Sequence, residues 1–289
     1  MTAKLLDGKA LAATMRGEFH DRITARGEMR RPKLVAILVG DNPASRTYVT
    51  AKRKACTEAG LLSELVTLPE TITQSELLAV IQQFNDDPAT HGILVQLPLP
   101  KQIAEEAVIN AVTPLKDVDC FHPENVGLLA AGHPRYYPCT PHGVVELVRR
   151  NGLSWAGANV VIVGRSNIVG KPLALMLMQK PTKANPAGGD ATVTVAHTRT
   201  ANLVSVCRSA DILVAATGQA HSITADMVKP GAIVVDVGTT VVNGKLAGDV
   251  HPAVVDVAAW LSPVPGGVGP MTITMLLANT LTAATLLDG

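Results

Sequence analysis

Val160-Val-Ile-Val-Gly-Arg-Ser-Asn-Ile-Val-Gly-Lys-Pro172 is the stretch that decides the fold class. It predicts a buried β-strand, a turn carrying Gly164 and Gly170, and the start of a helix. Such a turn can hold a dinucleotide's pyrophosphate, because backbone N–H groups at the helix N-terminus face the anion. The spacing departs from G-x-G-x-x-G, since Ser166 replaces the second glycine. The alternative interpretation is an ordinary strand-to-helix turn.

The next predicted strand carries information about the cofactor. It ends in Val195-Ala-His-Thr-Arg-Thr200, with no acid to bind the ribose 2′-hydroxyl of NAD. Thr198, Arg199 and the nearby Arg165 suit a 2′-phosphate instead, which favours NADP over NAD. A solvated loop residue is the alternative for Arg199. Thr239 ends a later strand and is expected at the same edge of the sheet, where ligands bind.

Short β-branched runs alternate with helical patterns on both sides of this stretch, which favours an α/β fold with parallel sheets. Residues 113–141 interrupt the alternation and predict a loop and linker, and residues 180–190 predict a surface loop. The strands are predicted at 33–40, 63–68, 92–97, 159–163, 191–196, 211–216 and 232–237, and the helices at 43–60, 74–85 and 104–112. Thr140-Pro-His-Gly143 can start a further helix that ends near Arg150. Asn42 and Thr73 are candidate caps for the first two helices.

Composition excludes several classes of protein. A net charge of +1 over 289 residues gives no general attraction to nucleic acid or to an anionic membrane. The four cysteines are scattered and no H-x-x-x-H pair occurs, so we expect a reduced protein without a metal site. No leader is evident, and no apolar run approaches the roughly 20 residues that span a bilayer. A soluble cytoplasmic protein is the expectation.

Tyr48 and Lys52 lie four residues apart on the predicted helix 43–60, so they share one face with small apolar residues. A lysine in an apolar stripe is costly unless its charge is paired or its pKa falls. Lys52 is therefore a candidate proton-transfer or polarising group, and Tyr48 a flat wall for a ring. The alternative is that Lys52 extends past the edge of the stripe to solvent.

Three further polar residues lie at the end of the predicted strand 92–97 or on the loop that leaves this part of the chain. Gln96 ends that strand, and its amide can both donate and accept hydrogen bonds. Asp117 and Asp119 lie on the loop beyond, where a carboxylate suits the paired N–H donors of an amino-pyrimidinone or, alternatively, caps a turn. The stretch Ser262-Pro-Val-Pro-Gly-Gly-Val-Gly-Pro-Met-Thr272 precedes an apolar helical segment. Its three prolines and three glycines predict either a rigid ligand wall or a stiff surface turn.

Together these pieces resemble the bifunctional methylenetetrahydrofolate dehydrogenase/methenyltetrahydrofolate cyclohydrolase family. The matching segments occur in the family's order over nearly the whole chain. They are Tyr48-Val-Thr-Ala-Lys-Arg-Lys54, Val95-Gln-Leu-Pro-Leu-Pro100, Lys116-Asp-Val-Asp119, Val163-Gly-Arg-Ser-Asn-Ile-Val-Gly-Lys-Pro172 and Pro265-Gly-Gly-Val-Gly-Pro-Met-Thr272. Short-chain dehydrogenases also use Tyr-x-x-x-Lys, but there the glycine-rich turn precedes the pair, which is the reverse of the order here.

The resemblance implies NADP-dependent oxidation of 5,10-methylenetetrahydrofolate to the methenyl form, followed by hydrolysis to 10-formyltetrahydrofolate. A dehydrogenase with lost or weak cyclohydrolase activity is the alternative. Lys52 would be the central catalytic group, with Gln96 setting its protonation state. The folate site would comprise Tyr48, Lys52, Val95, Gln96, Leu97, Asp119, Pro265, Gly266 and Gly267, and the NADP site Gly164, Arg165, Ser166, Gly170, Thr198, Arg199 and Thr239.

The resemblance also implies an organisation. A catalytic domain of residues 1–145, completed by a helix at 270–289, would face a Rossmann-like doubly wound domain of residues 146–269 across a cleft. A homodimer through the second domain is expected. Three features depart from the family's pattern: Cys120 where glycine is usual, Thr239-Thr240 where Ile-Asn is commoner, and the long 180–190 loop.

Overall fold

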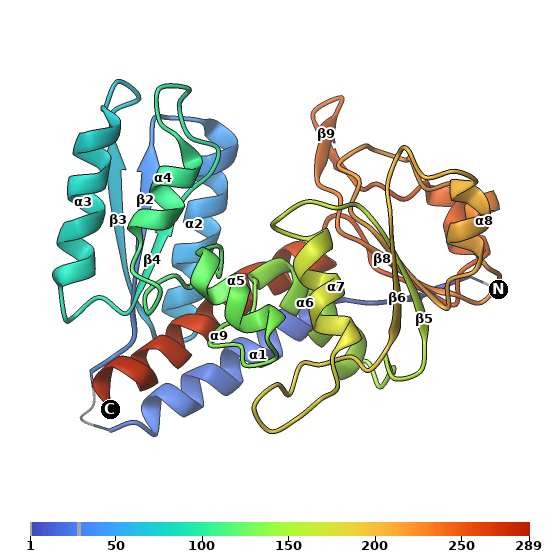
Figure 1. The fold of residues 1–289 in the computed structure, drawn as a ribbon, viewed down its shortest axis with the longest axis horizontal. Helices are drawn as coiled ribbons and strands as arrows, with labels where there is room; N and C mark the ends of the chain where they lie inside the picture. The colour runs from blue at the N-terminus through green and yellow to red at the C-terminus, as the bar shows by residue number, and fades with distance from the viewer. Residues whose placement is uncertain (1, 28–29) are drawn as a thin grey trace. The chain divides into compact units, whose positions relative to one another are not determined.

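The computed structural model describes residues 2–27 and 30–289 (Figure 1). These residues form two compact units, each described separately. The six-stranded unit comprises residues 2–12, 129–134 and 140–272, and the three-stranded unit comprises 13–27, 30–128, 135–139 and 273–289. Four helices run from one set of residues into the other: α1 (Gly8–Thr24), α5 (Pro123–Ala130), α6 (Cys139–Arg150) and α9 (Val268–Asp288). The domain limits expected from the sequence remain a prediction.

The three-stranded unit is built on a parallel sheet with β2 (Lys33–Val39) at its centre, between β3 (Leu62–Leu68) and β4 (Gly92–Val95). Val35 and Ile37 of β2 belong to a buried cluster with Leu77 and Ile81, as the alternation of a strand requires. Its helices are α2 (Pro43–Glu58), α3 (Gln74–Asp86), α4 (Glu105–Ala111) and α5 (Pro123–Ala130).

The predicted helix caps in this unit are confirmed. Thr73 accepts a hydrogen bond from the Glu76 backbone N–H, and the Glu76 carboxylate accepts one from the Thr73 backbone. Asn42 Oδ1 accepts the backbone N–H of Ser45 at 3.2 Å. Each side chain satisfies a donor that the first helical turn leaves unpaired. These local signals are sufficient to fix where α2 and α3 begin.

The prediction of a loop and linker over residues 113–141 is wrong where α5 lies within it, whereas the helix predicted to start at Thr140-Pro-His-Gly143 is confirmed as α6 (Cys139–Arg150). The carboxylate of Asp117 accepts the backbone N–H groups of Phe121, at 3.2 Å, and His122, at 2.9 Å, just ahead of α5. Phe121 and His122 precede the helix, so Asp117 orders the turn that leads into α5, and the backbone N–H of Glu124 in the first helical turn donates to His122 Nδ1 at 3.1 Å. Histidine is not among the preferred N-cap residues, so the composition of this stretch did not mark where the helix begins.

The six-stranded unit has one fully parallel sheet in the order β1-β11-β8-β7-β5-β6. Val163, the last residue of β5, lies in register with Ala196 of β6 and Ala215 of β7, so the loops after these strands leave the same edge. The strands are β1 (Lys4–Leu5), β5 (Asn159–Val163), β6 (Thr192–Ala196), β7 (Ile212–Ala215), β8 (Ile233–Asp236) and β11 (Trp260–Leu261).

Helices cover this sheet as in a doubly wound fold, which confirms the predicted class. Val161 and Leu213 bury one face in a cluster with Cys207 of α8 (Leu203–Arg208) and Met227 of η1 (Ala225–Met227), while α7 (Gly170–Met178) packs against β5 and β6. The sequence did not reveal β1, β11, the 3-10 helix η2 (Pro252–Asp256) or the antiparallel hairpin of β9 (Thr240–Val242) and β10 (Lys245–Ala247).

One expectation about a segment is wrong, and a second holds only in part. Helix α9 is, by length and composition alone, apolar enough to cross a membrane, contrary to the expectation that no such run exists; over half of its most apolar window is buried, and core helices pass the same test. The predicted surface loop 180–190 has a packed centre. Its Asn185 and Ala187 are buried, and Asn185 Nδ2 donates to Gln179 Oε1 at 2.6 Å.

Candidate active site and dinucleotide turn

Lys52 is a buried amine on α2, one turn after Tyr48, and only 5% of it is exposed. Its Nζ lies 4.7 Å from the centre of the Tyr48 ring, a cation–π distance. Burial lowers the pKa of Lys52 because desolvation disfavours the ammonium form, while Asp119 opposes the shift through its negative charge. The alternative of a lysine extending to solvent is therefore wrong.

Gln96, immediately after β4, fixes the amine. Lys52 Nζ donates to Gln96 Oε1 at 3.1 Å. Gln96 Nε2 donates to the Leu97 backbone carbonyl at 2.7 Å, which sets the orientation of the amide. The oxygen must then face the lysine, because the nitrogen is committed elsewhere. The structure confirms the predicted hydrogen bond between Lys52 and Gln96.

Asp119 completes this cluster from the loop after α4. Burial raises the pKa of its carboxyl group to about 6, and the charge of Lys52 partly opposes that rise. Cys139, at the start of α6, lies against both groups, and burial raises the pKa of its thiol. Sequence reasoning missed Cys139, since a lone cysteine before a helix carries no signal of its own.

Asp117 and Asp119 have different roles despite their identical chemistry. Asp117 is buried, and in addition to the backbone of Phe121 and His122 it accepts Asn125 Nδ2 at 2.8 Å. Asp117 is therefore a turn cap, which was the alternative interpretation for both aspartates. Cys120, the residue after Asp119, has φ +62°, in the left-handed region that glycine favours. The departure from the family's glycine thus places a side chain where backbone strain results.

A small pocket in the three-stranded unit adjoins Asp119. Val95 and Leu97 line it together with Asp119 and apolar residues of α4. Of the residues expected to bind substrate, the structure groups Tyr48, Gln96 and Asp119 around Lys52. Val95 and Leu97 share with Asp119 a pocket that the other three do not line. Pro265, Gly266 and Gly267 lie in the other unit, where Gly266 O accepts the Lys9 N–H at 2.8 Å. Their role as a folate wall stays a prediction.

The strand–glycine–helix turn after β5 admits only glycine at two positions. A Cβ on Gly164 would lie 2.1 Å from the Ala216 carbonyl oxygen, and one on Gly170 would lie 2.0 Å from the Gly164 oxygen. Gly164 also has φ +144°. Ser166 lies exposed between them, with its Oγ accepting the Val169 N–H at 3.1 Å. A glycine turn that leads directly into the N-terminus of α7 is the arrangement that pyrophosphate sites use.

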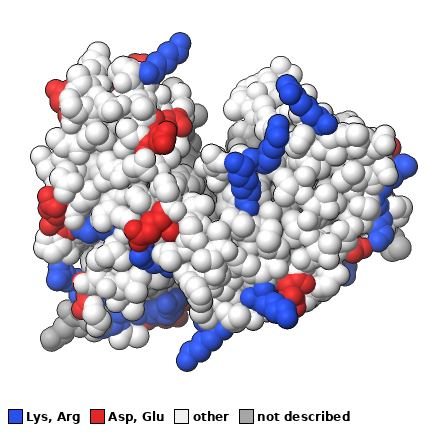
Figure 2. Space-filling view, in the orientation of Figure 1, with Lys and Arg blue, Asp and Glu red and all other residues white. Residues whose placement is uncertain are grey.

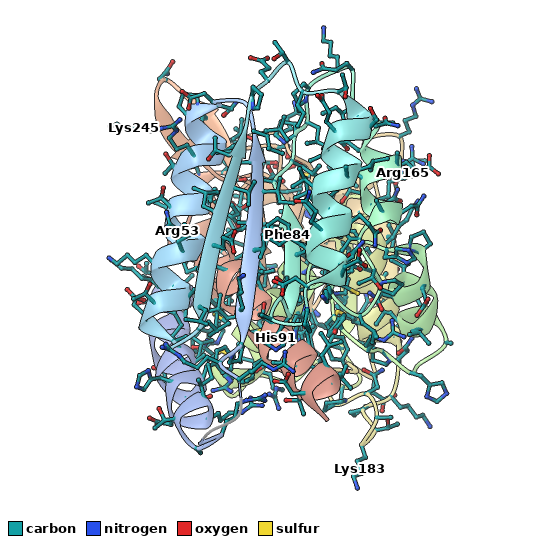
Figure 3. All side chains as sticks on the ribbon, turned by 90° about the vertical axis from the view of Figure 1, so that its left-hand side faces the viewer. Arg53, Phe84, His91, Arg165, Lys183 and Lys245 are labelled. Atoms are coloured by element: carbon teal, nitrogen blue, oxygen red, sulfur yellow. The ribbon has the colours of Figure 1, made fainter. Side chains whose placement is uncertain are left out.

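The groups expected to bind a 2′-phosphate lie at the same edge of the sheet. Thr198 and Arg199 are exposed in the turn after β6, and the His197 N–H donates to Thr200 Oγ1 at 2.9 Å to close that turn. Arg165, in the neighbouring turn after β5, extends away from the ribbon (Figure 3). Thr239 is exposed after β8. These four side chains fit an anionic cofactor, because two are arginines, two carry hydroxyl groups and none is acidic.

A parallel doubly wound sheet with this turn is typical of dinucleotide-binding proteins, and a buried lysine beside a glutamine is typical of a catalytic site. Two models of the tetrahydrofolate dehydrogenase/cyclohydrolase family match the sequence: the catalytic domain over residues 6–119 and the NAD(P)-binding domain over 138–287. The chain belongs to this family.

Known relatives cover nearly all of the chain. A protein of Rhodopirellula baltica named "Bifunctional protein FolD" is 53% identical over 98% of both chains. The bifunctional methylenetetrahydrofolate dehydrogenase/cyclohydrolase of Campylobacter jejuni is 45% identical, with a TM-score of 0.90 over 98% of this chain and 99% of its own. The corresponding Trypanosoma brucei enzyme, solved with NADP and an inhibitor, is 39% identical, with a TM-score of 0.90 over 99% and 98%.

Proposed function

We propose that this chain oxidises 5,10-methylenetetrahydrofolate to 5,10-methenyltetrahydrofolate with NADP and then hydrolyses the product to 10-formyltetrahydrofolate. The observation that carries the proposal is the Lys52 amine, buried against Tyr48 and hydrogen-bonded by Gln96. A cyclohydrolase needs a group that can hold or release a proton near neutral pH, and burial moves the pKa of Lys52 toward that range. A dehydrogenase alone would not require such an amine.

Each side chain has a role that follows from its chemistry. Lys52 polarises the one-carbon unit and manages the proton of the attacking water, and Gln96 keeps its amine in place. Asp119 is mostly ionised at neutral pH, so it can accept the paired N–H groups of the pterin. The Tyr48 ring supplies a flat surface for the folate.

NADP supplies the hydride acceptor when it is bound. The residues that would hold it belong to the six-stranded unit. Gly164 and Gly170 allow the turn after β5 to approach the pyrophosphate, while Ser166 offers a hydroxyl. Arg165, Thr198 and Arg199 would recognise the 2′-phosphate. Hydride transfer requires mainly that two rings be held in register, so this unit contributes binding and orientation.

The purified protein tests both reactions directly. Methylenetetrahydrofolate with NADP⁺ should produce the absorbance of methenyl product and NADPH, and added methenyltetrahydrofolate should lose its absorbance faster than in buffer. Absence of the first signal would reject the enzyme assignment. Presence of the first without the second would leave a dehydrogenase alone.

We further propose a cytoplasmic homodimer in one-carbon metabolism that supplies formyl groups for purine biosynthesis and binds neither nucleic acid nor membrane. The net charge of +1 supports the last two points, and Figure 2 shows basic and acidic side chains interspersed on the visible face. Light scattering should give twice the chain mass of 30.2 kDa. A monomeric mass would reject the dimer.

A further inference from the structure

Asp249 is a completely buried carboxylate in the six-stranded unit that the reaction described above does not use. Its Oδ2 accepts two backbone N–H groups, from Thr217 at 2.6 Å and from Gly218 at 2.9 Å. Both residues follow β7, at the edge of the sheet where the turn after β5 also lies. Asp249 therefore holds the backbone of the loop after β7, although it comes from the segment after the β9–β10 hairpin.

The same residue also reaches the loop after β8. A Cβ on Gly238 would lie 2.3 Å from Asp249 Oδ1, so this glycine makes room for the carboxylate. The Asp249 N–H donates to Asp236 Oδ1 at 2.9 Å, and the Gly238 N–H donates to the same oxygen at 2.9 Å. Asp236 and Asp249 together tie the loop after β7 to the loop after β8.

One oxygen of this carboxylate is unsatisfied. Asp249 Oδ1 is buried and has no hydrogen-bond partner within the described part of the chain. Burial of a charge disfavours the folded state unless the charge is fully paired, so stability alone does not favour a carboxylate here. Buried polar groups left incomplete in this way are typical of sites where position matters more than stability.

The sheet order indicates which part of the cofactor these loops face. Strand β5 lies between β6 on one side and β7, then β8, on the other. In a doubly wound sheet the turn after β5 takes the pyrophosphate and the β6 side takes the adenosine half. The loops after β7 and β8 are left for the nicotinamide half.

We propose that Asp249 is a positioning residue of the cofactor site, which holds the loops after β7 and β8 in the conformation that receives the nicotinamide end of NADP. The inference rests on the proposed function, because it concerns the same cofactor. Asp249 acts through the backbone of Thr217, Gly218 and the Gly238 loop, and it does not touch the reacting atoms.

The test compares Asp249→Ala, Asp249→Asn and a matched control. Asp211 also accepts a backbone N–H, that of Asn159 at 2.9 Å, but it precedes β7 at the opposite edge of the sheet. We expect Asp249→Ala to raise KM and Kd for NADP⁺ about tenfold or more, because two charge-assisted hydrogen bonds are lost. Asp249→Asn should recover part of this loss, since its amide oxygen can accept both N–H groups. Asp211→Ala should leave both constants unchanged.

Hydrolysis of added methenyltetrahydrofolate, which needs no cofactor, supplies the second measurement. It should stay at the wild-type rate in both Asp249 variants. Unchanged Kd for NADP⁺ in Asp249→Ala would overturn the inference. An equal loss of both activities, with a lowered Tm and no recovery in Asp249→Asn, would also overturn it, because the residue would then be structural only. A wild-type protein that binds NADP⁺ but does not reduce it would instead reject the proposed function.

Discussion

The catalytic cluster of the three-stranded unit and the cofactor turn of the six-stranded unit present ligand groups in opposite ways. In the first, the buried Lys52 amine does so, held by a hydrogen bond to Gln96 and favoured in its charged form by the nearby Asp119 carboxylate. In the second, glycines and backbone N–H groups form the site, and the charged Arg165 and Arg199 are exposed. Burial changes the chemistry of a side chain, whereas exposure leaves it as a recognition element.

Substitutions in the two regions should therefore change different properties of the enzyme. Changes in the buried cluster should alter a rate, because they remove a group with a shifted pKa. Changes in the turn should alter cofactor affinity, because they move backbone or remove an exposed charge. The predictions below test this division.

Lys52→Met should have the largest effect. It removes the only amine of the cluster, so we expect methenyl hydrolysis to fall by about 10³-fold. Lys54→Met is the matched control, since Lys54 is on the same helix with 79% of its side chain exposed. Hydrolysis at the wild-type rate in Lys52→Met would contradict the catalytic role assigned to Lys52.

Gly164→Ala should damage the cofactor turn. The new Cβ would meet the Ala216 oxygen and would sit at a φ that L-residues avoid. We expect KM for NADP⁺ to rise about tenfold or more, and the free energy of unfolding to fall by about 3 kcal/mol. Gly157→Ala is the control, because Gly157 also has a positive φ but has open space around it; it should cost about 1 kcal/mol and leave KM unchanged. Equal behaviour of the two variants would contradict the close-approach argument.

Acidic pH should weaken folate binding through Asp119. Its pKa is raised to about 6, so the carboxylate is charged above this pH and becomes protonated below it. Kd for the folate should therefore rise by about tenfold for each pH unit below that value. Asp119→Asn should bind weakly at every pH and show no such slope, and a slope that persists in this variant would assign the titration to another group.

Arg199→Ala should have a smaller effect, confined to cofactor choice. Loss of one exposed charge near a 2′-phosphate should lower kcat/KM for NADP⁺ about tenfold, with little change for NAD⁺. Arg208→Ala, an exposed arginine on α8, serves as the control. If the wild type uses both cofactors equally well, the 2′-phosphate argument fails.

Cys120→Gly should have the smallest effect. Glycine relieves the strain at φ +62° but loses a buried side chain, so the two contributions should nearly cancel, within about 1 kcal/mol. Cys56→Gly is the contrast, because Cys56 is buried inside α2 and glycine there loses packing and helix propensity; we expect a loss of about 2–3 kcal/mol. Urea unfolding measures both, and equal losses would contradict the strain at Cys120.

The sequence by itself determined what depends on local pattern. Periodicity placed β2, β5 and their neighbouring helices, Thr73 and Asn42 marked helix starts, and Lys52 followed from its place on an apolar stripe. Only the tertiary structure decided what depends on groups far apart in the chain. It separated Asp117, which orders the turn before α5, from Asp119, a half-buried acid beside Lys52. It also placed β1 in a sheet with residues near the other end of the chain, and buried Asp249 between two loops. A pattern reports which face of one element is apolar, whereas a pKa shift, a carboxylate that orders a turn or an unpaired oxygen depends on contacts that exist only after folding.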